Sequence, residues 1–90
     1  MIVALKDFRG EWHLDVGDYI KPRSLTPLTC GSLAEVLAIE PYETWSEDHR
    51  RLTYARVYLR LVWTGQEMYW HSTTTEKVGL LDALAAMAGA

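Results

Sequence analysis

Two runs of alternating hydrophobic residues between Thr53 and Ser72 constrain the fold of this chain more than any other feature of its sequence. They flank Thr64-Gly65, and a two-residue spacing of this kind is typical of a β-hairpin turn. The resulting register places Leu59 opposite Trp70 and gathers large apolar side chains on one face: Val57, Leu59, Leu61, Trp63, Met68 and Trp70. We expect this face to form the core. A shift of the strand pairing by one residue would expose the face to water, at a cost of roughly 1.5–3 kcal/mol for each large side chain.

The opposite face of this hairpin combines cations with aromatic rings, in a group that we call the stripe: Arg56, Tyr58, Arg60, Tyr69 and His71. The same register places Arg60 opposite Tyr69 and Tyr58 opposite His71. Rings beside guanidinium groups can stack on bases, contact a partner's aromatic side chains or bind acidic ones. Ordinary cross-strand pairs on a solvated sheet face have the same composition. Part of the stripe could also be covered by a C-terminal helix.

Three shorter segments predict further strands: residues 11–16, a short or edge strand at residues 19–22, and residues 33–39. The first alternates strictly and directs three apolar side chains to the core, which are Trp12, Leu14 and Val16. Gly17-Asp18 predicts the turn before the second, in which Pro22 limits ladder hydrogen bonding. The third is apolar except for Glu35, which favours a mostly buried strand.

Two long segments between these strands predict loops. Residues 23–32 lack periodicity and contain Pro27, Cys30 and Gly31. Residues 41–51 are rich in charge and hold one large aromatic residue, Trp45. We expect Trp45 to fold back onto the core, with display to a partner as the alternative. The acidic residues beside it are expected to solvate the loop, although they could also imitate a phosphate-like surface.

After Ser72 the spacing of the apolar residues changes from that of a strand to that of a helix, which predicts a helix over residues 75–88. Thr73-Thr74-Thr75-Glu76 matches a capping box, and three apolar residues are spaced for one side of a helix: Leu80, Leu84 and Met87. An alanine-rich helix of this length is marginal alone in water. We therefore expect it to dock on this domain or on another molecule.

Composition limits the chain to one small globular domain over residues 1–90, with a barrel at about 11–73 and the helix at about 75–88. Of its 90 residues, 49% are hydrophobic and 23% are charged, and the net charge of −3 repels nucleic-acid backbones and anionic membranes. The lone Cys30 cannot form an internal disulfide. The apolar start is interrupted by Lys6 and Asp7 without a basic leader, which argues against a secretory signal and for a cytoplasmic location.

Catalytic and metal chemistry find little support in the sequence. The three histidines (His13, His49 and His71) are not at metal-ligand spacing, and a single cysteine gives no zinc pattern. No local signature surrounds Ser24, Ser32 or Cys30, so we expect Cys30 to fill the core rather than to act as a nucleophile. We predict no cofactor, no metal and no enzymatic activity.

The order of the segments resembles a known family. Val16-Gly17-Asp18-Tyr19-Ile20-Lys21, a loop with a glycine, Ala34-Glu35-Val36-Leu37-Ala38-Ile39 and a long hairpin are similar to the small SH3-like barrels. Within that group the chain most resembles KOW-type modules and the short bacterial and phage "G-D-x-V" proteins. The resemblance covers residues 16–72 and implies a mostly-β fold, an SH3-like barrel of about five antiparallel strands. Ala34 replaces the glycine of KOW-type modules, and the basic character with which they hold RNA is missing.

These observations predict a non-enzymatic protein-interaction module of the kind found among small phage regulators and inhibitors. The stripe would dock another protein, Trp45 would extend the contact, and the C-terminal helix would pack within the domain or complete a homodimer. One alternative is nucleic-acid binding, with bases stacked on Tyr58, Tyr69 and His71 and phosphates held by cations: Arg50, Arg51, Arg56 and Arg60. A second alternative is a small enzyme that uses Cys30 or a histidine.

Overall fold

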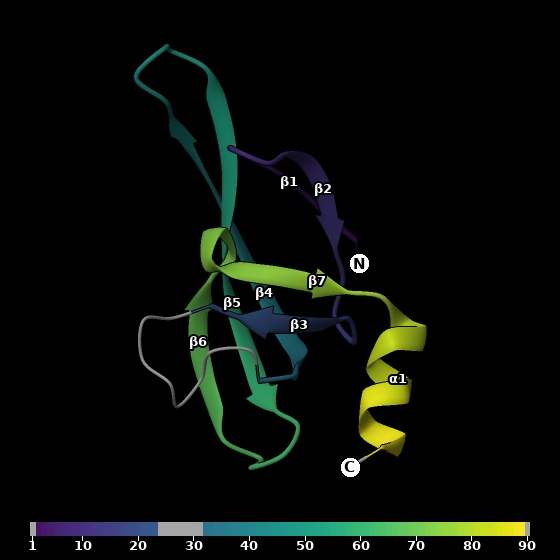
Figure 1. Ribbon diagram of the computed structural model, residues 1–90. Coiled ribbons are helices and arrows are strands. Elements are labelled where there is room, and N and C mark those ends of the chain that lie inside the picture. Colours follow the sequence, from purple (N-terminus) through teal and green to yellow (C-terminus); the bar gives the residue numbers. More distant parts are fainter. Residues whose placement is uncertain (1, 24–31, 90) are drawn as a thin grey trace.

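The computed structural model describes residues 2–23 and 32–89 and is mostly β, with one C-terminal helix (Figure 1). Most of the predicted loop at residues 23–32 lies outside the described residues, and Cys30 lies there with it. The elements are β1 (Val3–Asp7), β2 (Gly10–Leu14), β3 (Tyr19–Pro22), β4 (Ala34–Trp45), β5 (Arg51–Leu61), β6 (Glu67–His71), the 3₁₀ helix η1 (Ser72–Thr74), β7 (Thr75–Val78) and α1 (Leu80–Ala88).

The strands form one antiparallel sheet that nearly closes into a barrel, which confirms the predicted fold class. Their order is β2-β1-β5-β4-β3-β7, and β6 pairs with β5 beside this path. The described residues hold seven strands rather than about five, because β1 and β7 were not predicted. Among the same residues, no helix is both long and apolar enough to cross a membrane.

The core lies inside the curved sheet and is built mainly from alternate residues of the strands, whose side chains point inward. Its buried members come mainly from β1, β2, β4 and β5: Leu5, Leu14, Ile20, Ala34, Val36, Ala55, Val57, Leu59 and Leu61. Trp12, Ile39, Met68 and Trp70 pack against this cluster while they remain partly exposed. Two predicted core residues are exposed instead, because Val16 follows the end of β2 and Trp63 lies in the loop after β5.

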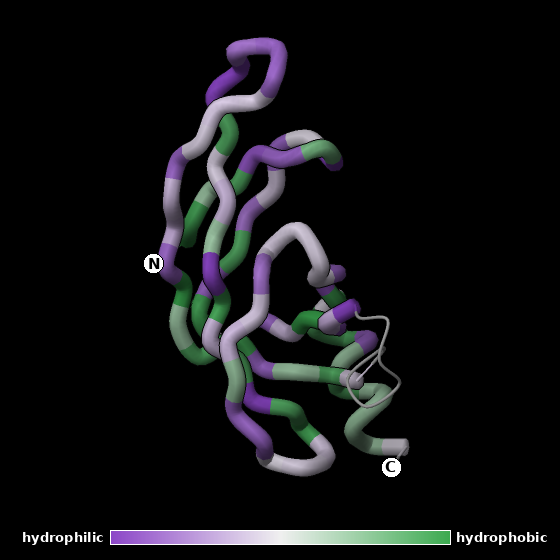
Figure 2. The backbone as a smooth tube through the Cα atoms, turned by 90° about the vertical axis from the view of Figure 1, so that its left-hand side faces the viewer, coloured by the Kyte–Doolittle hydropathy of each residue, from purple (hydrophilic) through white to green (hydrophobic). Residues whose placement is uncertain are grey.

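The β4–β5 hairpin is much longer than predicted and reaches beyond the barrel (Figure 1). The predicted loop at residues 41–51 is wrong, since β4 runs to Trp45 and β5 begins at Arg51. Only residues 46–50 form the turn, which is closed by hydrogen bonds from the Ser46 amide to the Arg50 carbonyl (2.9 Å) and from the His49 amide to the Ser46 carbonyl (3.0 Å). This tip is the hydrophilic end of the molecule (Figure 2).

The β5–β6 hairpin exists as predicted, but its register differs by two residues. Leu59 lies opposite Met68 rather than Trp70, and Tyr58 lies opposite Tyr69 rather than His71. The loop is longer than Thr64-Gly65, because Leu61 donates its amide hydrogen to the Gln66 carbonyl at 2.8 Å. A shift by two residues keeps every strand residue on its predicted face.

The C-terminal segment folds differently from the prediction. The supposed capping box forms η1 and the start of β7, and β7 pairs with β3 along Thr75–Val78. Helix α1 begins only at Leu80 and follows Gly79, which offers no side-chain cap. It buries Ala83, whereas Leu80 and Leu84 of the predicted docking side are 61% and 49% exposed.

Candidate binding face

The structure places all five residues of the stripe on one face of the sheet. The β5–β6 pairing sets Arg56 opposite His71, Tyr58 opposite Tyr69, and Arg60 opposite Glu67. Their neighbours in sequence (Ala55, Val57 and Leu59) are fully buried on the other face. Because successive side chains of a strand alternate between faces, the burial of these neighbours directs the stripe outward.

Tyr69 is the centre of the contacts within the stripe. Its ring centroid lies 4.7 Å from that of Tyr58, and the Arg56 guanidinium carbon lies 4.2 Å from the Tyr69 ring centroid. Tyr69 nevertheless remains 51% exposed. The contacts therefore hold the ring in a fixed position while its surface stays open to solvent, and a pre-positioned aromatic ring loses little entropy when it binds.

Two further tyrosines extend the stripe, and neither was predicted as a site residue. The rings of Tyr42, Tyr54 and His71 form a cluster with centroid separations of 5.6–6.0 Å. Tyr42 comes from β4, where it lies opposite Tyr54 on β5. We call the seven residues together the aromatic–arginine face: Tyr42, Tyr54, Arg56, Tyr58, Arg60, Tyr69 and His71.

Hydrogen bonds at His71 assign the tautomer of its ring. The Thr73 amide donates to Nδ1 at 3.4 Å, and the Thr73 hydroxyl lies 2.6 Å from the same nitrogen. An amide can only donate, so Nδ1 accepts and Nε2 carries the hydrogen. Nε2 therefore donates to the Tyr42 hydroxyl oxygen, with which it is hydrogen bonded. The Tyr42 hydroxyl keeps its own hydrogen as a donor for a ligand.

Glutamates of β4 neutralise the arginines along this face. Glu40 lies opposite Arg56 and pairs with it at 2.9 Å, and Glu35 pairs with Arg60 at 3.1 Å. Nearer the tip, Arg51 pairs with Glu43. The cations proposed for phosphate binding are thus matched by carboxylates, and in the described part of the chain only Arg50 of that set forms no ion pair.

A shallow hollow of about 390 Å³ lies on the aromatic–arginine face. Its lining comes from three strands and consists of Tyr42, Arg56, Tyr69, Trp70 and His71. Aromatic rings thus supply its walls and one paired guanidinium its polar edge. Such a hollow suits an apolar or aromatic side chain of a partner that also offers a hydrogen-bond acceptor.

Trp45 is displayed rather than folded back, which makes the expectation of a tucked side chain wrong. It ends β4 opposite Arg51 and is 69% exposed. By the two-residue alternation of β4, Trp45 lies on the opposite side of the hairpin from Tyr42. It is therefore a separate exposed ring and not a continuation of the aromatic–arginine face.

Helix α1 leaves the aromatic–arginine face open. It follows β7 on the side of the molecule away from β6 (Figure 1). Its exposed residues include Leu80, Leu81 and Leu84, and Asp82 is its one charged residue. The helix consequently presents a small apolar surface of its own.

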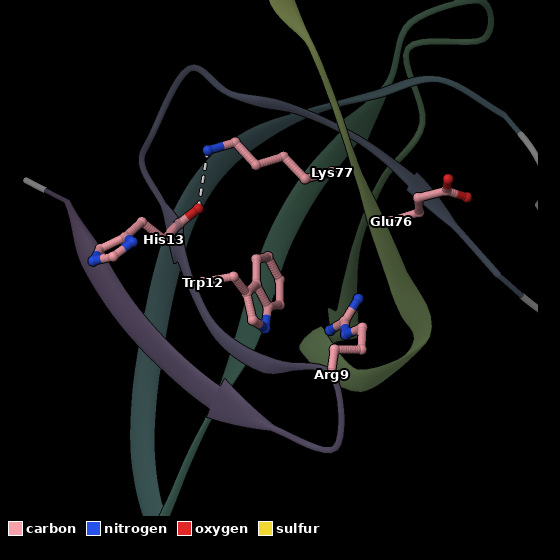
Figure 3. A pocket seen from close by; sticks show the side chains of 5 residues that line it. All are labelled: Arg9, Trp12, His13, Glu76 and Lys77. Atoms are coloured by element: carbon pink, nitrogen blue, oxygen red, sulfur yellow. Dashed lines mark hydrogen bonds between the residues drawn. The ribbon is translucent and has the colours of Figure 1, made fainter.

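A second hollow, of about 410 Å³, lies at the seam where β2 and β7 approach each other without pairing (Figure 3). Arg9, Trp12 and His13 line it from one side, and Glu76 and Lys77 from the other. Both of its cations are engaged: Lys77 donates to the His13 carbonyl oxygen at 3.0 Å, and Arg9 pairs with Asp7 at 2.7 Å. This arrangement holds the seam together and offers no free charge to a ligand.

The histidines lie apart from one another, on β2, in the tip of the long hairpin and at the end of β6. Within residues 2–23 and 32–89, no three His, Cys, Asp or Glu side chains are grouped to hold a metal ion. Ser24 and Cys30 lie outside the described residues.

A comparison of the chain with models of protein families, with curated proteins and with solved structures gives no match.

The sequence does not predict Tyr42 as a site residue, because Pro41 indicates the start of a loop at that point. The residue types Tyr42, Thr44 and Trp45, which are enriched in strands, were the available signal that β4 continues. Proline is compatible with a strand at an edge of a sheet, and beyond Glu35 the described pairing of β4 is with β5 alone.

Proposed function

We propose that this chain is a protein-binding module without catalytic activity and that it docks its partner on the aromatic–arginine face. The observation that carries this proposal is the pairing of exposed, pre-positioned rings with arginines that β4 glutamates already neutralise. Tyr and Arg, with Trp, are the residues enriched where binding energy concentrates in protein interfaces. A module of this kind would regulate or inhibit its partner by covering part of the partner's surface.

The charge balance of the face favours a protein over a nucleic acid. Phosphate binding requires cations that can release counterions, and Arg56 and Arg60 would first have to leave Glu40 and Glu35. With a net charge of −3, the whole chain adds repulsion at long range. A protein partner can instead bind the rings and exchange hydrogen bonds with the ion pairs at their rim.

Affinity capture with the tagged chain, using lysate of the source organism treated with nuclease, tests this proposal. Tyr42→Ala removes a ring from the face and leaves β6 intact, whereas Trp63→Ala removes a ring of similar exposure from the loop after β5. We expect one stoichiometric protein partner that wild type and Trp63→Ala retain and Tyr42→Ala loses, with a cost of about 2 kcal/mol or roughly 30-fold in Kd.

Other outcomes would overturn the proposal in distinct ways. If nuclease treatment abolishes capture, the aromatic–arginine face binds nucleic acid rather than protein. A partner retained equally by Tyr42→Ala and Trp63→Ala would place the binding surface elsewhere on the molecule. Both variants require a thermal melt beside wild type, so that a loss of capture is not confused with a loss of fold.

A further inference from the structure

Among residues 2–23 and 32–89, no strand pairs with one of the two edges of β6. Its other edge pairs with β5. The Leu61 amide donates to the Gln66 carbonyl at 2.8 Å, which identifies Leu61 and Gln66 as a hydrogen-bonded pair. Because such pairs alternate in an antiparallel ladder, Met68 and Trp70 direct their backbone groups toward β5. The backbone N–H and C=O groups of Glu67, Tyr69 and His71 therefore point away from β5.

This edge carries few of the features that normally protect an edge strand. Its sequence, Glu67-Met68-Tyr69-Trp70-His71, contains neither proline nor lysine, and the described pairing of β6 shows no bulge. The His71 carbonyl accepts from the Thr74 hydroxyl at 3.0 Å, while the outward backbone groups of Glu67 and Tyr69 have no hydrogen-bond partner among the described residues. The short length of β6 is its main protection.

We propose that β6 pairs edge to edge with β6 of a second copy of this chain, antiparallel and centred on Tyr69. In that register Tyr69 lies opposite the second Tyr69, and Glu67 lies opposite His71 in both directions. Each of these residues directs its backbone groups toward the new edge, so every opposed pair on this face can exchange hydrogen bonds. The strand is thus complementary to itself, as a two-fold interface requires.

Side chains agree with this register on both faces of the extended sheet. On the aromatic–arginine face, each Glu67 carboxylate lies opposite a His71 ring whose two nitrogens already contact Thr73 and Tyr42, and no carboxylate faces another carboxylate. Glu67 is available for this contact, because Arg60, which lies opposite it on β5, pairs with Glu35. On the other face Met68 meets Trp70, a pairing of sulfur with an aromatic ring.

Alternative registers are less favourable for the same strand. A pairing centred on Glu67 would oppose two carboxylates, which is destabilising. Centres at Met68 or Trp70 would leave part of the five-residue strand unpaired. Only the pairing centred on Tyr69 uses all residues of β6 and keeps the carboxylates apart.

This self-association goes beyond the proposed function and does not depend on it. Pairing takes place at the backbone edge of β6, so the sheet face stays uncovered, and the side chains that meet across the new edge are those of Glu67, Tyr69 and His71. Two copies would present two aromatic–arginine faces side by side in one continuous sheet. A dimer of this kind would bind a partner with repeated sites through both copies at once.

The mass of the full chain in solution, measured by sedimentation equilibrium from about 1 μM to about 1 mM, tests the proposal. We expect the mass to rise from monomer to dimer within this range. Tyr69→Pro removes the central N–H donor of the new edge and no donor to β5, so it should leave a folded monomer. Tyr69→Val keeps that donor and should still dimerise.

A second variant covers the case in which Tyr69→Pro fails to fold. Tyr69→Glu places two carboxylates directly opposite each other at the centre of the interface, and it should weaken the dimer by roughly 2- to 5-fold in Kd. A chain that stays monomeric at about 1 mM overturns the proposal. A dimer unaffected by Tyr69→Glu, and by Tyr69→Pro where that variant folds, also overturns it. Dissociation by Leu81→Gln alone would assign the dimer to α1.

Discussion

The guanidinium of Arg9 donates a 2.8 Å hydrogen bond to the carbonyl oxygen of Ser72, which lies 63 residues further along the chain. A second nitrogen of the same group bonds the Thr75 carbonyl. Arg9 itself is held in place by Asp7, with which it pairs at 2.7 Å. One side chain of the β1–β2 turn thereby joins the first hairpin to η1 and β7, where the barrel has no strand pairing of its own.

Asp7 anchors this connection, and its charge makes the fold sensitive to acid. Burial raises the pKa of the Asp7 carboxyl, but hydrogen bonds from the Arg9 side chain and amide and from the Trp12 indole outweigh it, and the net pKa is lowered. A lowered pKa in the folded state contributes stability above the unfolded-state value of about 3.9, which is lost as the pH falls through the folded-state pKa.

We expect Asp7→Asn to lower the free energy of unfolding by about 2–3 kcal/mol at pH 7, because Arg9 is left partly buried without a counter-charge. The difference between wild type and Asp7→Asn should shrink as the pH falls below about 4. Urea unfolding at several pH values measures both effects. A difference that stays constant down to pH ~2 would mean that the carboxylate charge contributes nothing.

Ser72 supports the same region from within. It is fully buried, and its hydroxyl oxygen accepts the amide hydrogen of Ala55 at 2.9 Å. Ser72→Ala leaves this buried amide without an acceptor and should cost about 1–3 kcal/mol in urea unfolding. Ser46→Ala removes a comparable bond to the Arg50 amide in the exposed tip and should cost less than about 1 kcal/mol. Equal costs for the two variants would contradict the assigned role of Ser72.

The β5–β6 hairpin shows most clearly how much of the fold the sequence predicts. The period of two placed every strand residue on its correct face, so the core and the stripe were both identified. The register was wrong by two residues because Thr64-Gly65 lies inside a longer loop, in which the Gly65 amide bonds the Leu61 carbonyl at 2.8 Å. Loop length depends on backbone conformations that two residue names do not determine.

Strands β1 and β7 were missed for a different reason. In β1 the buried positions are Leu5 and Asp7, and a carboxylate at a core position interrupts the hydrophobic alternation that identifies a strand. Asp7 can be buried there only because Arg9 and Trp12 bind it, and that compensation appears only in the folded structure. In β7 the local sequence favours a helix start with a capping box, but the segment instead forms a strand because it pairs with β3.

Gly17 is required by the turn between β2 and β3. Its φ of +93° lies in a region that residues with a side chain rarely adopt. Its amide donates to the Val36 carbonyl at 2.9 Å. We expect Gly17→Ala to lower the free energy of unfolding by about 1–2 kcal/mol. Gly89→Ala, at a φ of −84°, should change it by less than about 0.5 kcal/mol. Thermal melts of the two variants compare them directly, and an equally small shift for both would show that the turn relaxes without strain.

The two sides of α1 should differ sharply in their response to the same substitution. Leu81 is 81% exposed, and glutamine has a helix propensity close to that of leucine, so Leu81→Gln should change the free energy of unfolding by less than about 0.5 kcal/mol. Ala83 is fully buried, and Ala83→Gln forces a larger, polar side chain into the packed side of the helix at about 2–3 kcal/mol. Urea unfolding at low protein concentration measures both values. If Leu81→Gln proved as costly as Ala83→Gln, then α1 in solution would pack through its leucines, and the exposed apolar surface would not exist.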